Sequence, residues 1–143
     1  MYPPYSFKIK GEQGREVIFD GSRNLWVRLT PEEWVRQNFL QYLLQEMHYP
    51  ASLTAVEKEL QLGELKKRFD ILVYNQQHQP WMMIECKSMD VQLDEKVLAQ
   101  ILRYHIAIPV PFLVITNGSY CAAFEKIDGT LREMDALPLF GSM

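Results

Sequence analysis

The sequence predicts an α/β domain, with helices flanking a central mixed β-sheet of four or more strands and a β arm at the N-terminus. Two segments, 30–49 and 94–108, carry apolar residues at helical spacing. Several shorter runs alternate apolar and polar residues or are continuously apolar, as strands do. Strands this apolar must be buried on both sides, so we expect helices on both faces of the sheet.

The composition is that of one globular domain. The 143 residues include 15 Lys and Arg against 18 Asp and Glu, a net charge of −3, and 48% are hydrophobic. This apolar content excludes intrinsic disorder. No apolar run has membrane-spanning length, so no membrane partner is expected. Two cysteines and a start without a signal pattern favour the cytoplasm. The acidic balance argues against a generally basic nucleic-acid-binding surface.

The chain is expected to form a single domain, residues 1–143, with its core at about 30–125. Residues 1–29 are predicted as an extended β arm or hairpin. A helix then begins at a capping box, in which Thr30 is the N-cap, Pro31 occupies the first helical position and Glu33 the third. Pro50 ends this helix.

The remaining elements follow from apolar runs between turn signals. Asn117-Gly118 predicts a hairpin turn between the last two strands. The order expected after the first helix is strands at 53–62, 68–74 and 81–87, a helix at 94–108, strands at 112–116 and 120–125, and a loose tail at 135–143.

Two of the apolar strands carry carboxylates at unusual places. Asp70 precedes a β-rich run, and Glu85 follows another, with Lys87 on the same face as Glu85. If these strands pair, Asp70 and Glu85 lie about 5 Å apart. Two carboxylates this close repel each other, and a divalent cation such as Mg²⁺ would resolve the conflict. The alternative is that both are solvated strand-edge carboxylates, but Asp70, Glu85 and Lys87 together favour a site.

Several segments together resemble a known family. The pattern Asp70…Glu85-Cys86-Lys87 is similar to the PD-(D/E)XK nuclease motif. The chain resembles more closely the N-terminal nuclease domain of type I restriction enzyme R subunits, in a small stand-alone form, over about residues 17–125. The segments that carry the likeness are 30–37, 68–74, 84–88, 100–104 and 116–118. Phe69 stands where the motif name has proline, and the chain has no room for the helicase motor of a full R subunit.

The resemblance implies a restriction-endonuclease-like sandwich that hydrolyses DNA phosphodiester bonds with Mg²⁺, for which Mn²⁺ can substitute. Asp70 and Glu85 would hold the metal, with the backbone carbonyl of Cys86 as a further ligand. Lys87 would orient the attacking water and stabilise charge. Gln100 and Tyr104, at i and i+4 on one helical face, match the family's Gln-x-x-x-Tyr element; without the family, a polar helix surface fits them equally well.

Such sites often add a glutamate from the first helix, and two candidates exist. Glu33 already has the capping role, whereas Glu32 shares the inward face of Val35 and Phe39, so Glu32 is preferred. Arg36 lies on the same face and is expected to pair with a carboxylate.

Other polar residues receive weaker assignments. The cluster Lys66-Lys67-Arg68 at a hairpin turn is a candidate phosphate contact, although solvent exposure explains it equally well. The side chain of Cys86 is expected to fill space on the face away from the site. His48, His78 and His105 have no ligand spacing, so they are assigned to the surface or to packing.

Two functional hypotheses follow. The first is a Mg²⁺-dependent endonuclease acting on DNA in restriction-modification, with a homodimer and a separate motor or specificity subunit as candidate partners. The second is a non-catalytic nucleic-acid-binding or protein-interaction module on the same fold, which the net charge of −3 favours.

Overall fold

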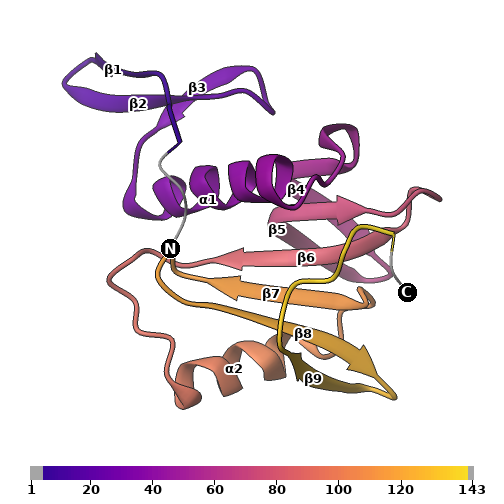
Figure 1. Cartoon of the computed structure of the whole chain (residues 1–143). Helices are drawn as coiled ribbons and strands as arrows, with labels where there is room; N and C mark the ends of the chain where they lie inside the picture. The colour runs from indigo at the N-terminus through magenta and orange to yellow at the C-terminus, as the bar shows by residue number, and fades with distance from the viewer. Residues whose placement is uncertain (1–4, 142–143) are drawn as a thin grey trace.

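The protein forms four stacked layers in a computed structural model that describes residues 5–141. Figure 1 shows a small N-terminal sheet, then helix α1 (Pro31–Gln41), then the main sheet, and then helix α2 (Glu95–His105) on the far side. The two helices therefore cover opposite faces of the main sheet, as the sequence predicts. Among the described residues, no helix is both long and apolar enough to cross a membrane.

The N-terminal arm is a complete three-stranded antiparallel sheet rather than an extended segment or a simple hairpin. Its strands are β1 (Ile9–Glu12), β2 (Arg15–Asp20) and β3 (Leu25–Arg28), paired in that order. Ile18 is fully buried on the face toward α1. Asp20 ends β2 and accepts backbone hydrogen bonds from Ser22 and Arg23, which fixes the turn into β3. Residues 1–4 of the predicted arm lie outside the described residues.

Helix α1 begins where the capping signal predicts. The Thr30 hydroxyl accepts a 3.0 Å hydrogen bond from the backbone N–H of Glu33, and Pro31 opens the first turn. The α-helix ends at Gln41, earlier than the predicted 49, and continues as a π-helical turn, η1 (Tyr42–Glu46). A short 3₁₀ helix, η2 (Ala51–Leu53), follows Pro50.

The main sheet contains six strands in sequential order. They are β4 (Thr54–Leu62), β5 (Leu65–Tyr74), β6 (Pro80–Cys86), β7 (Phe112–Thr116), β8 (Cys121–Ile127) and β9 (Thr130–Met134). Only the β6–β7 pair is parallel, because helix α2 forms the crossover between them. The mixed sheet is thus confirmed, and β9 is an additional edge strand that the sequence did not predict.

Two hydrophobic cores lie on the two faces of this sheet. The core under α1 contains Phe39, Leu43 and Trp81, together with the fully buried Cys86 side chain. The core under α2 contains Leu72, Met83 and Leu113. Cys86 therefore fills space away from Glu85, as expected. The continuous burial of β6 and β7 on both faces explains why these strands read as apolar runs.

The C-terminal segment is anchored, although it is neither helix nor strand. The Tyr49 hydroxyl donates a 2.5 Å hydrogen bond to the carbonyl of Pro138. Leu137 and Phe140 pack against the core under α1, where the Phe140 ring contacts Tyr49 and Trp81. A loose tail was predicted for 135–143, but residues 137–140 are held against the core by these contacts. Residues 142–143 lie outside the described residues.

Candidate active site

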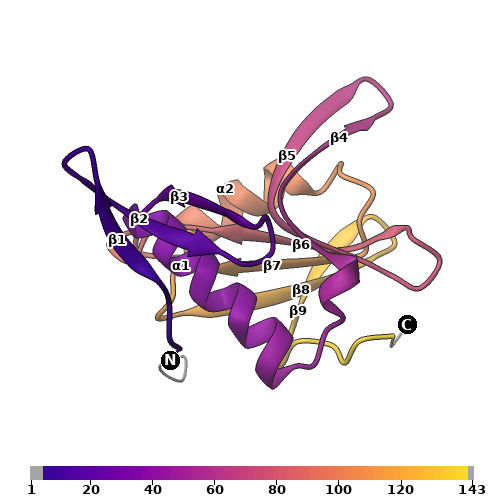
Figure 2. The same ribbon diagram turned by 90° about the horizontal axis from the view of Figure 1, so that it is seen from above.

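Asp70 lies where β5 separates from β6. The ladder between the two strands runs from Tyr74 to Ile71, and Asp70 is the next residue of β5. Figure 2 shows β4 and β5 curving away from the rest of the sheet. Asp70 Oδ2 accepts a 2.7 Å hydrogen bond from the backbone N–H of Cys86. Burial raises the pKa of Asp70, and the hydrogen bonds from Cys86 and Arg36 offset this only in part.

Glu85 lies near the end of β6 on the face opposite the Cys86 side chain. Its Oε2 lies 3.2 Å from Lys87 Nζ, and its Oε1 lies 3.8 Å from Lys67 Nζ and 3.4 Å from His105 Nε2. Burial alone would raise the pKa of Glu85. The hydrogen bond with His105 and the charges of Lys67 and Lys87 outweigh burial and lower this pKa to about 2. Glu85 is therefore ionised at neutral pH.

A pocket of about 460 Å³ opens beside Glu85, between the sheet and α2. The residues that line it are Lys67, Glu85, Lys87, Val91, Val97, Gln100, Ile101, Tyr104 and His105. Predicted residues from two strands and one helix therefore share a single cavity. Charged groups line its sheet side, and the polar residues of α2 complete it.

Helix α2 brings Gln100 and Tyr104 to this pocket. The helix begins at Asp94, whose Oδ1 accepts a 2.9 Å hydrogen bond from the backbone N–H of Val97. Gln100 and Tyr104 lie one turn apart, and Tyr104 is 56% exposed. The Lys67 ammonium lies 5.2 Å from the centroid of the Tyr104 ring. An exposed ring at a pocket mouth is available to a ligand.

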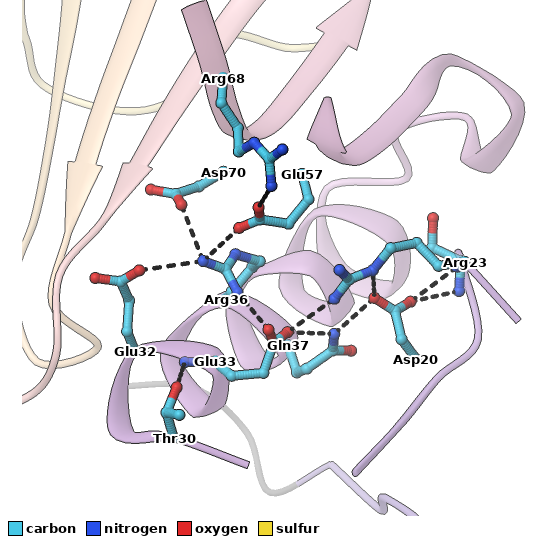
Figure 3. Close-up of polar contacts among 11 residues, drawn as sticks. Asp20, Arg23, Thr30, Glu32, Glu33, Arg36, Gln37, Glu57, Arg68 and Asp70 are labelled. Atoms are coloured by element: carbon cyan, nitrogen blue, oxygen red, sulfur yellow. Dashed lines mark hydrogen bonds and ion pairs between the residues drawn. The ribbon is translucent and has the colours of Figure 1, made fainter. Parts of the chain in front are cut away.

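Arg36 joins several carboxylates on the other side of Asp70 (Figure 3). Its Nη2 lies 3.2 Å from Glu32 Oε1, 2.8 Å from Glu57 Oε1 and 3.0 Å from Asp70 Oδ1. Its Nη1 donates to Glu33. Burial opposes the charge of Arg36, but the surrounding carboxylates hold its pKa above the ordinary value. The expected pairing of Arg36 with a carboxylate is confirmed.

Comparison with known protein families shows which family the chain belongs to. The family described as type I restriction enzyme R protein N terminus (HSDR_N) matches residues 31–138. The chain belongs to this family. No curated protein matches the chain. The match begins at α1, so strands β1 to β3 precede the part shared with the HSDR_N family.

In this HSDR_N domain, Glu32 and Glu33 have different surroundings. Glu33 is buried, and its carboxylate is held by Arg23, Arg36 and Gln37. Glu32 is half-exposed and reaches only Arg36 among the ion pairs of the described residues. Burial and the neighbouring Asp70 charge raise the pKa of Glu32. Glu33 is thus committed to the ion-pair network, and Glu32 is the helix carboxylate with an oxygen still available.

The predicted metal ligands fall into two neighbouring groups. Asp70 and Glu32 meet at Arg36, whereas Glu85 faces Lys67, Lys87 and His105. Within residues 5–141, no three His, Cys, Asp or Glu side chains gather as a metal site. The donor chemistry nevertheless fits Mg²⁺, which takes one or two carboxylates and completes its shell with water and phosphate. Burial is the main cause of the raised pKa values of Asp70 and Glu32, and repulsion by neighbouring carboxylates adds to it.

The predicted basic cluster is divided by strand alternation. Lys66, Lys67 and Arg68 lie within β5, after the Gly63–Glu64 turn rather than at it. Lys67 is largely buried and faces Glu85, whereas the exposed Lys66 and Arg68 pair with Glu59 and Glu57. The sequence therefore placed three cations together that the fold separates.

His105 is the residue that sequence reasoning missed. It is 4% exposed, its Nδ1 lies 2.8 Å from the Ile101 carbonyl, and its Nε2 approaches Glu85. The packing assignment was incomplete, because the His105 ring also faces Glu85, beside Lys67 and Lys87. Its place directly after Tyr104 was the available signal. His48 and His78 are exposed, as expected.

Proposed function

We propose that this domain is a Mg²⁺-dependent endonuclease that hydrolyses DNA phosphodiester bonds. The observation that carries the proposal is the shared pocket of Glu85, Lys87, Gln100 and Tyr104, with Asp70 on the adjoining strand. Membership of the type I restriction enzyme R protein N-terminal family supports a nuclease-related role. Acidic, cationic and aromatic groups at one cavity are suited to a phosphodiester with its flanking nucleotides.

Asp70 and Glu85 would hold the metal, with Glu32 and the Cys86 carbonyl as further oxygen ligands. Bound Mg²⁺ would polarise the phosphate and lower the pKa of a coordinated water, and Mn²⁺ would substitute for it. Glu85 suits the ligand role because its low pKa keeps it ionised. Asp70 suits it because the hydrogen bond from the Cys86 N–H holds this carboxylate beside the Glu85–Lys87 segment, and a bound metal would replace Arg36 at its Oδ1.

Lys87 would orient the attacking water and stabilise the charge that develops on the phosphate. Its ammonium is partly exposed at the pocket and lies next to Glu85. A fixed cation beside developing negative charge lowers the barrier most when water is partly excluded. Gln100 and Tyr104 would position the strand from α2. Lys67 would contact a phosphate in the pocket, and Lys66 and Arg68 would contact phosphates outside it. His105 would hold Glu85 in place.

The partners proposed with this activity are DNA, a second copy of the chain, and a separate motor or specificity subunit. Cleavage of both strands of a duplex needs two catalytic centres or two successive nicks. Size-exclusion chromatography with and without DNA distinguishes a monomer from a dimer.

Nicking of supercoiled plasmid in Mg²⁺ or Mn²⁺ tests the proposal. The wild-type protein should convert the plasmid to open-circle and linear forms, and EDTA should prevent this. Asp70→Ala and Lys87→Ala should abolish nicking while remaining folded by circular dichroism. Arg132→Ala, which removes an exposed cation from the edge strand β9, is the matched control and should retain activity. Equal nicking by all four proteins would identify a contaminating nuclease and overturn the proposal.

A non-catalytic nucleic-acid-binding or protein-interaction module is the second candidate. Both oxygens of Asp70 are engaged, one by Arg36 and one by Cys86, which favours a structural role for this carboxylate. Calorimetric titration with Mn²⁺ separates the two functions. Binding that Glu85→Ala removes supports the nuclease, whereas absence of binding to the wild-type protein supports the module.

A further inference from the structure

The outer face of the N-terminal sheet presents aromatic rings on neighbouring strands. Phe19 of β2 lies directly opposite Trp26 of β3 in the strand register. Side chains alternate along a strand, and Ile18 and Asp20 on either side of Phe19 are fully buried toward α1. Phe19 and Trp26 therefore point away from the body of the protein. Their centroids are 5.4 Å apart at an interplanar angle of 68°, and both rings are partly exposed.

Cations surround these rings. Lys10 of β1 and Arg28 of β3 both pair with Val17, so they share its outward direction. Lys10 Nζ lies 4.3 Å from the Trp26 centroid, and Lys8 Nζ lies 5.7 Å from the Phe19 centroid. Arg15 lies on the same face through its pairing with Glu12, the acidic residue here. We define the outer sheet face by its rings and cations: Lys8, Lys10, Arg15, Phe19, Trp26 and Arg28.

The outer sheet face has an excess of positive charge, whereas the whole chain has an excess of negative charge. The protein has a net charge of −3, yet the outer sheet face combines four exposed cations with one glutamate, Glu12, which lies 3.6 Å from Lys10. A local excess of positive charge on an acidic protein is complementary to a polyanion. Figure 1 shows that this sheet is the outermost layer on the α1 side, so its outer face has no neighbouring element among the described residues.

We propose that the outer sheet face binds single-stranded DNA. Two neighbouring bases stack on Phe19 and Trp26, while Lys8, Lys10, Arg15 and Arg28 contact the flanking phosphates. The choice of DNA rests on the proposed function, and the surface itself is independent of the active site. The sheet lies before residue 31, where the match to the HSDR_N family begins, so this binding adds to what the family domain provides.

The aromatic pair selects an unpaired strand. Bases in a duplex have their π-faces buried in the helical stack, so a duplex could use only the cations of this face. An unpaired strand uses both the rings and the cations, which is how sequence-tolerant single-strand binding surfaces are built. The lysine ammonium groups that lie over the rings are on long flexible stems. A stacked base contributes more than the exposed cation–π contact it displaces, and the lysines then move to the phosphates.

Fluorescence anisotropy with a labelled oligothymidylate of about 20 nucleotides tests this binding, in EDTA so that no metal-dependent cleavage occurs. The double variant Phe19→Ser/Trp26→Ser should weaken binding about tenfold or more. Lys10→Gln/Arg28→Gln should reduce the slope of log affinity against log salt by about 1.4. Tyr120→Ser and Arg132→Gln, exposed on the loop after β7 and on β9, are matched controls and should leave the affinity unchanged.

Tryptophan fluorescence provides a second readout that does not depend on a disruptive variant. A base stacked on Trp26 should quench its emission, whereas Trp81 is buried in the core and Trp34 of α1 packs against Phe7 outside the outer sheet face. Trp26→Phe should retain most of the affinity, because it keeps a ring, but lose most of the quenching. This variant keeps the proposal testable even if the double serine variant does not fold.

Several outcomes would overturn the proposal. They are tighter binding of a duplex or of an oligouridylate than of the oligothymidylate, unchanged affinity in a folded double serine variant, and quenching that persists in Trp26→Phe. Failure of the nuclease assignment is distinguishable from these outcomes. A protein that binds the oligonucleotide in EDTA but never nicks plasmid would retain the outer sheet face and lose only the proposed catalysis.

Discussion

Asp70 Oδ2 accepts a 2.7 Å hydrogen bond from the backbone N–H of Cys86, the residue between Glu85 and Lys87. The regular ladder between β5 and β6 covers Ile71 to Tyr74 of β5, so Asp70 is the first residue of β5 beyond its end. The carboxylate thus replaces a backbone acceptor at the point where the strands diverge. This contact holds Asp70 beside the Glu85–Lys87 segment. The candidate site therefore lies where β5 and β6 diverge, because the divergence leaves the Cys86 N–H free to bind the carboxylate.

The stability contributed by Glu85 should depend on pH. The pKa of Glu85 is lowered to about 2 in the folded protein, against about 4.3 in an unfolded chain. A lowered carboxyl pKa adds stability that is complete above the unfolded value and is lost as the pH falls through the folded value. By urea unfolding, the wild-type protein should exceed Glu85→Gln by about 3 kcal/mol at neutral pH. The gap should close between about pH 4.3 and pH 2; a gap that stays constant would contradict the assigned cause.

Arg36→Gln should be strongly destabilising. The substitution leaves Glu33, Glu57 and Asp70 near one another without the cation that joins them. Removing one partner of a buried ion pair costs about 3–5 kcal/mol, which urea unfolding measures. Arg132→Gln, exposed on β9, removes the same charge outside the network and should change stability by less than about 0.5 kcal/mol. An equal effect of the two substitutions would show that the network contributes no more than a surface charge.

Tyr104→Ala should separate activity from stability. The ring is 56% exposed and rests on Lys67 rather than in the core, so the free energy of unfolding should change by less than about 0.5 kcal/mol. Plasmid nicking should nevertheless fall by about tenfold or more, because the strand loses a positioning contact. Tyr104→Phe keeps the ring and should show which part of the loss belongs to the hydroxyl. A large loss of stability in Tyr104→Ala would instead indicate a packing role.

Asp94→Ala should weaken the helix that carries Gln100 and Tyr104. The Asp94 carboxylate caps α2 through the backbone N–H of Val97. Loss of such a cap costs about 1 kcal/mol, measurable by urea or thermal unfolding. Asp94→Asn is the matched control, because asparagine caps helices equally well and should cost only a few tenths of a kcal/mol. Equal losses in both variants would assign the effect to charge rather than to capping.

Local sequence signals were sufficient to predict most of the helices and strands. The capping box of Thr30 located the start of α1, and Asn117-Gly118 located the turn between β7 and β8. Strand β9 was missed because Thr130–Met134 is short and mostly polar, and it forms through pairing with β8. The N-terminal sheet was read as an arm because each of its strands is short, and their common register appears only when all three are paired.

The sequence by itself determined the α/β class, the chemical types of Asp70, Glu85 and Lys87, and the family to which they point. These follow from residue identity and from periodicity along the chain, which are local properties. Only the tertiary structure decided that Arg36 reaches Asp70 and that His105 faces Glu85. It also decided that Lys67 points toward Glu85, away from Lys66 and Arg68. Those relationships join residues from different elements, and their distances depend on strand divergence and helix docking, which no local pattern encodes.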